Sequence, residues 1–156
     1  MPNDILGDDM STPEAATADQ SALKSAKDDL VRNLEDLRPL WARSQTTRNR
    51  YAIYPFLEAV FELVTTAQRK GISRYLAKKA AKLSPTTYNT DNLFMAVIHC
   101  VTPAGAVESR TRSKWARALG HAQRTKNAAE PLRVFILKQG GINECASRFR
   151  RRSRAT

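Results

Sequence analysis

The chain has 156 residues, a length typical of one domain, and 42% of them are apolar, which is enough to build a hydrophobic core. Charged residues make up 26%, and there are only six glycines and seven prolines, so collagen-like and wholly disordered chains are excluded. The formal net charge is +11, which favours a polyanionic partner.

The amino-terminal part is acidic and the rest of the chain is basic. Residues 1–40 contain nine acidic and four basic residues, whereas residues 41–156 contain six acidic and 22 basic residues. We predict a flexible, disordered acidic arm over residues 1–16, one helical domain over 17–152 and the end of a basic tail at 153–156. The arm is either a solubilising tail or a segment that folds back and competes with an anionic ligand for the basic surface.

The first predicted helix begins near Pro13, or later where Thr17 and Gln20 have the spacing of a capping box, and it carries a narrow apolar stripe. Proline at position 39 is expected to end or kink this helix. The stripe is typical either of an outer helix lying on the core or of a seam with a partner helix, including that of a homodimer. Its residues are Leu23, Leu30, Leu34, Leu37 and Trp41.

The middle of the chain supplies the predicted core. Residues 51–67 are apolar nearly all round, which predicts a buried central helix, with Pro55 tolerated in its first turn. A shorter helix is predicted over residues 72–83. After a polar loop, Asp91 is expected to cap a further apolar helix over residues 92–101.

The remaining elements are also predicted to be helical. A long basic helix covers residues 109–126, a shorter one covers 132–139, and a last one follows Gly140 and Gly141. The apolar run at residues 134–137 would also suit a short strand, but no partner strand is evident, so we favour helix. The fold class predicted is therefore all-α, a compact bundle of about six helices with a basic carboxyl-terminal tail.

No catalytic, cofactor or metal site is predicted. The sequence has no phosphate-binding glycine loop, nucleophile elbow or zinc-protease motif. The spacing of His99, Cys100, His121 and Cys145 matches no compact zinc motif, and His99 lies in an apolar segment typical of a core histidine.

A cytoplasmic location is the expectation, with no membrane partner. The amino-terminal sequence is acidic and lacks the basic start of a secretory signal. The longest apolar window, residues 93–101, is far shorter than the roughly 20 residues that a membrane-spanning helix needs.

Two predicted helices carry bases at every third or fourth position. Like charges at this spacing destabilise an isolated helix, so an external anion that offsets the repulsion is favoured over an ordinary solvated surface. On the 109–126 helix, Trp115 is expected to enter the core while the bases and His121 face outward. Arg112 and Lys126 do not follow that pattern. The bases are Lys70, Arg74, Lys78 and Lys82 on one helix and Arg110, Lys114, Arg117 and Arg124 on the other.

The segment from Pro131 to Arg154 resembles the helix, glycine turn and helix of bacterial DNA-binding modules. The similarity to Fis-type helix-turn-helix segments rests on Gly140, Gly141, Ile142 and Ala146. It departs from that pattern where arginines replace the leucine-glycine-isoleucine stretch. The resemblance implies that Asn143, Glu144, Ser147 and Arg148 reach base edges, and that Arg150, Arg151, Arg152 and Arg154 hold phosphates. The alternative is a helical hairpin followed by a basic tail.

These patterns together predict a binding protein for duplex DNA that acts largely through phosphate contacts. Aromatic residues are sparse among the bases, which favours duplex DNA over single-stranded RNA. The predicted role is that of a small bacterial or mobile-element transcription regulator or accessory factor. The alternative function is a protein-binding adaptor or inhibitor whose basic face docks on an acidic protein.

Overall fold

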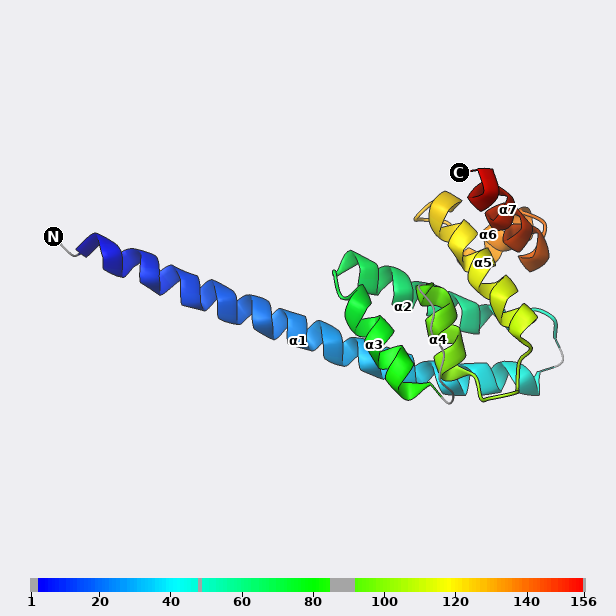
Figure 1. Ribbon diagram of the computed structural model, residues 1–156, viewed down its shortest axis with the longest axis horizontal. Coiled ribbons are helices and arrows are strands. Elements are labelled where there is room, and N and C mark those ends of the chain that lie inside the picture. The colour runs from blue at the N-terminus through cyan, green and yellow to red at the C-terminus, as the bar shows by residue number, and fades with distance from the viewer. Residues whose placement is uncertain (1–2, 48, 85–91, 156) are drawn as a thin grey trace.

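The fold is helical throughout the residues described by the computed structural model, which are 3–47, 49–84 and 92–155 (Figure 1). Within these ranges, side chains are described from Asp19 to Ser153. The seven helices of the described chain are α1 (Asn3–Thr46), α2 (Tyr54–Arg69), α3 (Ser73–Leu83), α4 (Leu93–Val101), α5 (Ser109–Thr125), α6 (Leu132–Lys138) and α7 (Ile142–Ala155). The predicted all-α class is confirmed, including the choice of helix over strand for residues 134–137.

Helix α1 is longer than predicted at both ends. It continues past Pro39 to Thr46, although proline has no N–H to bond the carbonyl of Glu35. Leu37 is buried before the proline, and Leu40 and Trp41 pack against the core after it, so packing on both sides holds the helix together.

The amino-terminal part of α1 covers the residues for which a flexible acidic arm is predicted. The helix begins at Asn3 and runs outward from the other helices instead of folding back on them (Figure 1). Extending a helix that already exists costs less free energy than starting one, because each added residue gains a hydrogen bond for two fixed dihedrals. At the other end of the chain, the predicted tail continues α7 as far as Ala155.

The apolar stripe of α1 faces the core of its own chain. Leu30, Leu34 and Leu37 are 4%, 1% and 2% exposed, so the outer-helix alternative is confirmed and the prediction that these three leucines meet a partner is wrong. Leu23 remains 42% exposed, and Trp41 is half-buried. The sequence of the stripe does not distinguish the two alternatives, because a helix that packs on its own chain and a helix that packs on a partner need apolar residues at the same spacing.

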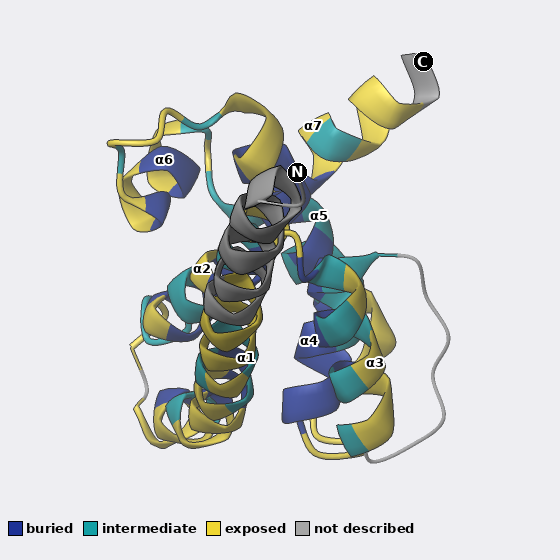
Figure 2. Cartoon of the chain, turned by 90° about the vertical axis from the view of Figure 1, so that its left-hand side faces the viewer, coloured by how far each residue is buried: buried dark blue, intermediate teal, exposed yellow. Residues whose placement is uncertain are grey.

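Helix α2 is the centre of the core, as predicted. Phe56 is fully buried and meets Trp115 of α5 edge-on, with ring centroids 6.2 Å apart. Phe61 stacks on Phe94 of α4 at 6.1 Å. Pro55 lies in the first turn, where it costs no hydrogen bond. Buried residues concentrate where α1, α2, α4 and α5 meet (Figure 2).

Helix α4 starts on a different cap from the one predicted. The side chain of Asn92 accepts a hydrogen bond from the Met95 amide at 3.2 Å, whereas Asp91 lies outside the described residues. His99 is buried in α4, as expected of a core histidine, and burial lowers its pKa. None of the described helices is long and apolar enough to cross a membrane.

Candidate nucleic-acid interface

A two-glycine turn joins α6 to α7. Gly140 and Gly141 have φ angles of +105° and +104°, a backbone region that residues with a side chain rarely adopt. The Gly141 amide donates to the Ile136 carbonyl at 2.9 Å, which closes the end of α6. The tight turn predicted from these glycines is confirmed, and it lets the chain start α7 at Ile142.

Helix α7 is held against α5 by a close approach at Gly120. A side-chain carbon added to Gly120 would come 2.6 Å from the Phe149 ring, so only glycine leaves room for that ring. Cys145 and Ala146 are buried on the same side of α7. The guanidinium of Arg124 lies 4.4 Å from the centre of the Phe149 ring, on the solvent side of this contact.

Replacing Gly120 by alanine is expected to destabilise the protein, by about 1 kcal/mol or more in urea unfolding, because the Phe149 ring must be displaced. In a helix interior, glycine to alanine otherwise stabilises by about 1 kcal/mol. The sign should therefore invert in a Phe149→Ala background, where Gly120→Ala becomes stabilising. A stabilising effect in the presence of Phe149 would contradict the close approach.

The outer side of α7 carries the residues that the resemblance assigns to DNA. Asn143, Ser147, Arg150, Arg151 and Arg152 are all exposed. Residues three and four apart share a face of a helix, so Asn143, Ser147 and Arg150 follow one line along it. The side chain of Arg154 lies outside the described residues. Figure 2 shows this outer side as the exposed part of α7.

The arginines of α7 divide into paired and unpaired members. Glu144 accepts hydrogen bonds from Arg148 and Arg151, each at 3.1 Å, and these bonds lower its pKa. For Arg150 and Arg152 no ion pair with a described carboxylate is found. Among the α7 arginines whose side chains are described, Arg150 and Arg152 are thus the two that Glu144 does not pair, and their charge is available to a ligand.

Arg148 also fixes the turn. Its guanidinium donates to the Gln139 side-chain oxygen, which lies 3.1 Å from Nε2 of His121 on α5. One amide oxygen therefore links α5, the end of α6 and α7. Arg148 therefore helps to position α7, and its guanidinium is only partly available to contact a DNA base.

The stripe predicted on α5 is only partly at the surface. Arg110 is exposed, Lys114 and Arg117 are half-buried, and Arg124 is exposed beside Phe149. The prediction that His121 faces outward is wrong, because it is 6% exposed and lies against the Phe135 ring of α6. Helices α6 and α7 cover both sides of the second half of α5, which a single helical wheel does not reveal.

The two basic residues that did not fit the α5 pattern make structural contacts. Arg112 is buried and donates to the Thr102 hydroxyl at 3.0 Å and to the Pro103 carbonyl at 3.2 Å, which ties α5 to the end of α4. Lys126 donates to the carbonyls of Asn127 and Glu130 and so closes the connection to α6. The sequence signal for these structural roles was that Arg112 and Lys126 lie outside the row of bases along the helix.

The stripe on α3 is exposed as predicted but lies apart from α5. Among the described residues α3 contacts α1, α2 and α4, and α4 in turn contacts α5 (Figure 1). No described carboxylate pairs with the bases of this stripe. Its members on α3 are Arg74, Lys78 and Lys82, all exposed. The prediction that Lys70 shares a helix with them is wrong, because exposed Lys70 caps the end of α2 and Gly71, with a φ of +73°, separates the two helices.

Both cysteines are expected to be unreactive in the folded protein. Burial raises the pKa of Cys100, and raises that of Cys145 from 9.0 to about 11, so both remain thiols at neutral pH. A chromogenic disulfide reagent at pH 8 should label both cysteines only as fast as the chain unfolds, and both at once in urea. Rapid labelling of one thiol in the native state would contradict this.

The same raised pKa gives a pH dependence of stability. The contribution of the neutral Cys145 thiol is present below pH 9 and is lost as the pH rises toward 11, because the unfolded chain ionises first. A Cys145→Ala variant should lose less stability over that interval.

Among the described residues, no three histidine, cysteine or acidic side chains gather in a way that could hold a metal ion. Comparison of the chain with protein-family models, with curated proteins and with solved structures gives no match.

Proposed function

We propose that the protein binds duplex DNA, with α7 lying in the major groove and the bases around it contacting phosphates. The observation that carries the proposal is the outer side of α7, where exposed Arg150 lies on the same face as Asn143 and Ser147 and has no described acidic partner. Arg152, further along the helix, is also exposed and has no described acidic partner. The major groove admits an α-helix, and arginine and asparagine can each make paired hydrogen bonds to a base edge.

The packing of α7 supports a role in recognition. A helix that reads base edges must be held in a fixed orientation, and α7 is fixed by the Gly120 contact with Phe149 and by the Gln139 links. Arg110, Lys114 and Arg124 of α5 would add phosphate contacts from the neighbouring helix. We extend the proposal to a biological role in transcription regulation or an accessory function on DNA. This role depends entirely on the proposed DNA binding.

The test is a titration of labelled duplex DNA at several salt concentrations. If about six to eight phosphates are engaged, the logarithm of the association constant should fall with the logarithm of salt concentration with a slope of roughly −5 to −7. A slope shallower than about −2 would reject phosphate-mediated binding. A single strand of the same sequence, measured in parallel, should bind more weakly.

A protein partner is the second candidate, because α6 exposes two apolar side chains on one face. Val134 and Leu137 are 41% and 43% exposed. Replacing both by serine should leave DNA affinity unchanged under the first proposal. Retention of the protein by polyglutamate as strongly as by DNA at equal salt would favour an acidic protein partner.

A further inference from the structure

A row of bases on α3 is not used by the contacts proposed for α7 and α5. Arg74, Lys78 and Lys82 are exposed and recur at every fourth residue. At 3.6 residues per turn they centre about 180° from Leu76 and Ala80, the buried residues of this helix. The outward side of α3 is therefore cationic along most of its length, in a row of about 12 Å at 1.5 Å per residue.

The row extends onto α1 at Tyr75. The ammonium groups of Lys27 on α1 and Lys79 on α3 lie 5.0 Å and 5.7 Å from the centroid of the Tyr75 ring. Tyr75 itself lies one turn from Lys78 and two turns from Lys82 on the same side of the helix. These bases together form what we call the α3 basic surface, which consists of Lys27, Arg74, Lys78, Lys79 and Lys82.

No carboxylate of the described chain neutralises the α3 basic surface. The sequence has no acidic residue between Glu62 and Asp91. None of the five bases makes an ion pair with a described carboxylate, and Asp29, which follows closely after Lys27, pairs with Arg32. The first turn of α3 also lacks an acidic residue. An external anion would therefore relieve the repulsion between these charges.

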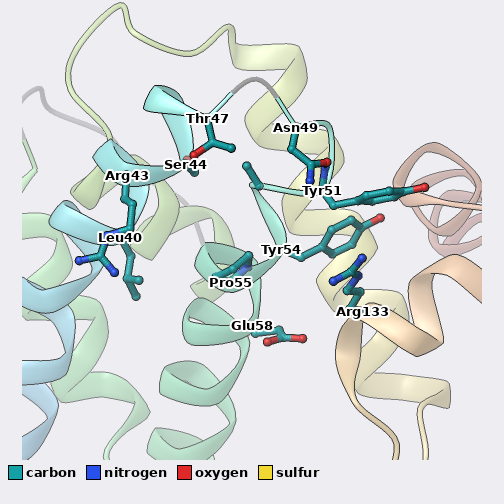
Figure 3. A pocket seen from close by; sticks show the side chains of 11 residues that line it. Leu40, Arg43, Ser44, Thr47, Asn49, Tyr51, Tyr54, Pro55, Glu58 and Arg133 are labelled. Atoms are coloured by element: carbon teal, nitrogen blue, oxygen red, sulfur yellow. The ribbon is translucent and has the colours of Figure 1, made fainter.

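The cations beside the end of α1 are placed differently. Arg43 and Arg133 line a pocket of about 390 Å³ between α1, α2 and α6, but Glu58 lines it with them (Figure 3). Arg133 also lies against Tyr51, with its central guanidinium carbon 5.0 Å from the ring centroid. Because a carboxylate at the same pocket opposes an anionic ligand, this part of the molecule does not extend the cationic surface.

The α3 basic surface and the outer side of α7 belong to different parts of the bundle. Helix α3 contacts α1, α2 and α4, whereas α7 contacts α5 and α6, and no contact joins α3 to α5, α6 or α7 within the described chain. In both Figure 1 and Figure 2, α5 lies between α3 and α7. The molecule therefore presents two cationic surfaces on separate sets of helices.

The side chains of α3 suit phosphates better than base edges or lipid. Besides its bases, the only exposed residue of the helix is Ala81, so no exposed amide or hydroxyl of α3 can read a base edge. Insertion into a membrane surface needs large apolar side chains beside the bases, whereas Ile72 and Leu76 are buried. A duplex carries about one phosphate charge per 1.7 Å of its axis, so several phosphates can lie opposite the row.

We propose that the α3 basic surface binds the phosphate backbone of a second DNA duplex, so that one molecule bridges two duplexes. The inference rests on the proposed binding of a first duplex by α7. The second duplex is held without recognition of its sequence, because α3 offers charges and no exposed group that reads bases.

The experiment captures one duplex by means of another. A short biotinylated duplex is fixed on streptavidin beads, the full chain is bound to it at low salt, and a fluorescent duplex of unrelated sequence is added after washing. The chain should retain the fluorescent duplex on the beads. If three phosphates are engaged at α3, the logarithm of the association constant for this second duplex should fall with the logarithm of salt concentration with a slope of about −2.7. This slope is shallower than the one expected for the first duplex.

Replacing Arg74, Lys78 and Lys82 together by glutamine should lower retention of the second duplex about tenfold or more. Fluorescence anisotropy should show that affinity for the first duplex changes by less than about threefold, because α7 is unaltered. Circular dichroism checks that the fold is retained. The matched control removes three exposed cations that lie outside the α3 basic surface, through Arg32→Gln, Arg43→Gln and Lys138→Gln, and should retain the second duplex as the unchanged chain does.

The possible failures separate this inference from the proposed function. Retention of the second duplex by the α3 variant overturns the inference, because two copies of the chain would then form the bridge through α7. Equal loss of retention in the control variant also overturns it, because total charge would then govern capture. If the unchanged chain binds the first duplex but retains no second one, bridging is wrong and DNA binding by α7 stands.

Two further results would change the assignment of the surfaces. If the α3 variant binds a long duplex more weakly and a short one as before, and no second duplex is retained, then one bent duplex contacts both surfaces and bridging is wrong. If the α3 variant loses the first duplex while the variant with Arg150→Gln and Arg152→Gln keeps it, then α3 is the DNA surface, and both the inference and the proposed role of α7 are wrong.

Discussion

Replacing Arg150 and Arg152 together by glutamine is expected to weaken duplex DNA binding roughly sixtyfold at 0.1 M salt. Each lost phosphate contact lowers the magnitude of the salt slope by about 0.9, so two lost contacts lower it by about 1.8. At 0.1 M salt this difference in slope lowers the association constant by nearly two orders of magnitude. The reason for choosing these two arginines is that neither has a described acidic partner, so neither is needed to balance Glu144. Fluorescence anisotropy across a salt series measures both quantities.

The matched control changes the same number of charges elsewhere. Lys24 and Arg32 are exposed on α1, and Arg32 pairs with Asp29. Lys24→Gln with Arg32→Gln should alter affinity by less than about threefold, because contacts with phosphate are local. If both double variants weaken binding equally, total charge rather than α7 governs association, and the proposed interface is wrong.

Replacing Phe56 by alanine is expected to lower the free energy of unfolding by about 3–5 kcal/mol. Phe56 is fully buried in α2, and its ring meets Trp115 of α5, so the change removes contacts between the central helix and the helix that supports α7. Since small proteins are stable by only about 5–15 kcal/mol, this is a large share of the total.

Urea unfolding followed by circular dichroism measures this loss, and Phe56→Leu is the control. Leucine refills most of the space and should cost much less than alanine. The tryptophan fluorescence of Phe56→Ala should also shift, because Trp115 loses the ring beside it. A loss below about 1 kcal/mol would mean that α2 is not the centre of the core.

The core was predictable because burial imposes a repeating pattern on each helix. Leu34 and Leu37 of α1 and Trp115 of α5 lie where their apolar stripes place them, and Phe56 is buried in a helix predicted to be apolar nearly all round. Helix ends were harder to predict. Pro39 breaks a helix when propensity alone decides, but here the packing of residues on both sides outweighs the lost hydrogen bond.

The candidate sites were less predictable, because they depend on which helices meet. His121 was placed with the bases by its spacing along the helix, yet it is buried where α6 and α7 pack on α5. Gly120 in the middle of a helix was the available signal for a close neighbour. Nothing in the sequence brings Lys27 to Tyr75, since the two lie far apart along the chain and meet only through the packing of α1 beside α3.

The continuity of α1 has an electrostatic consequence for its acidic end. Among the described side chains of α1, Asp19 precedes Leu30, the first that is buried, by about 16 Å along the axis at 1.5 Å per residue. Ions screen exposed charges beyond about 8 Å at physiological salt, so the carboxylate of Asp19, held on a helix at this distance, contributes little to the potential at the other helices. The continuous helix thus keeps this negative charge away from the cations of the bundle.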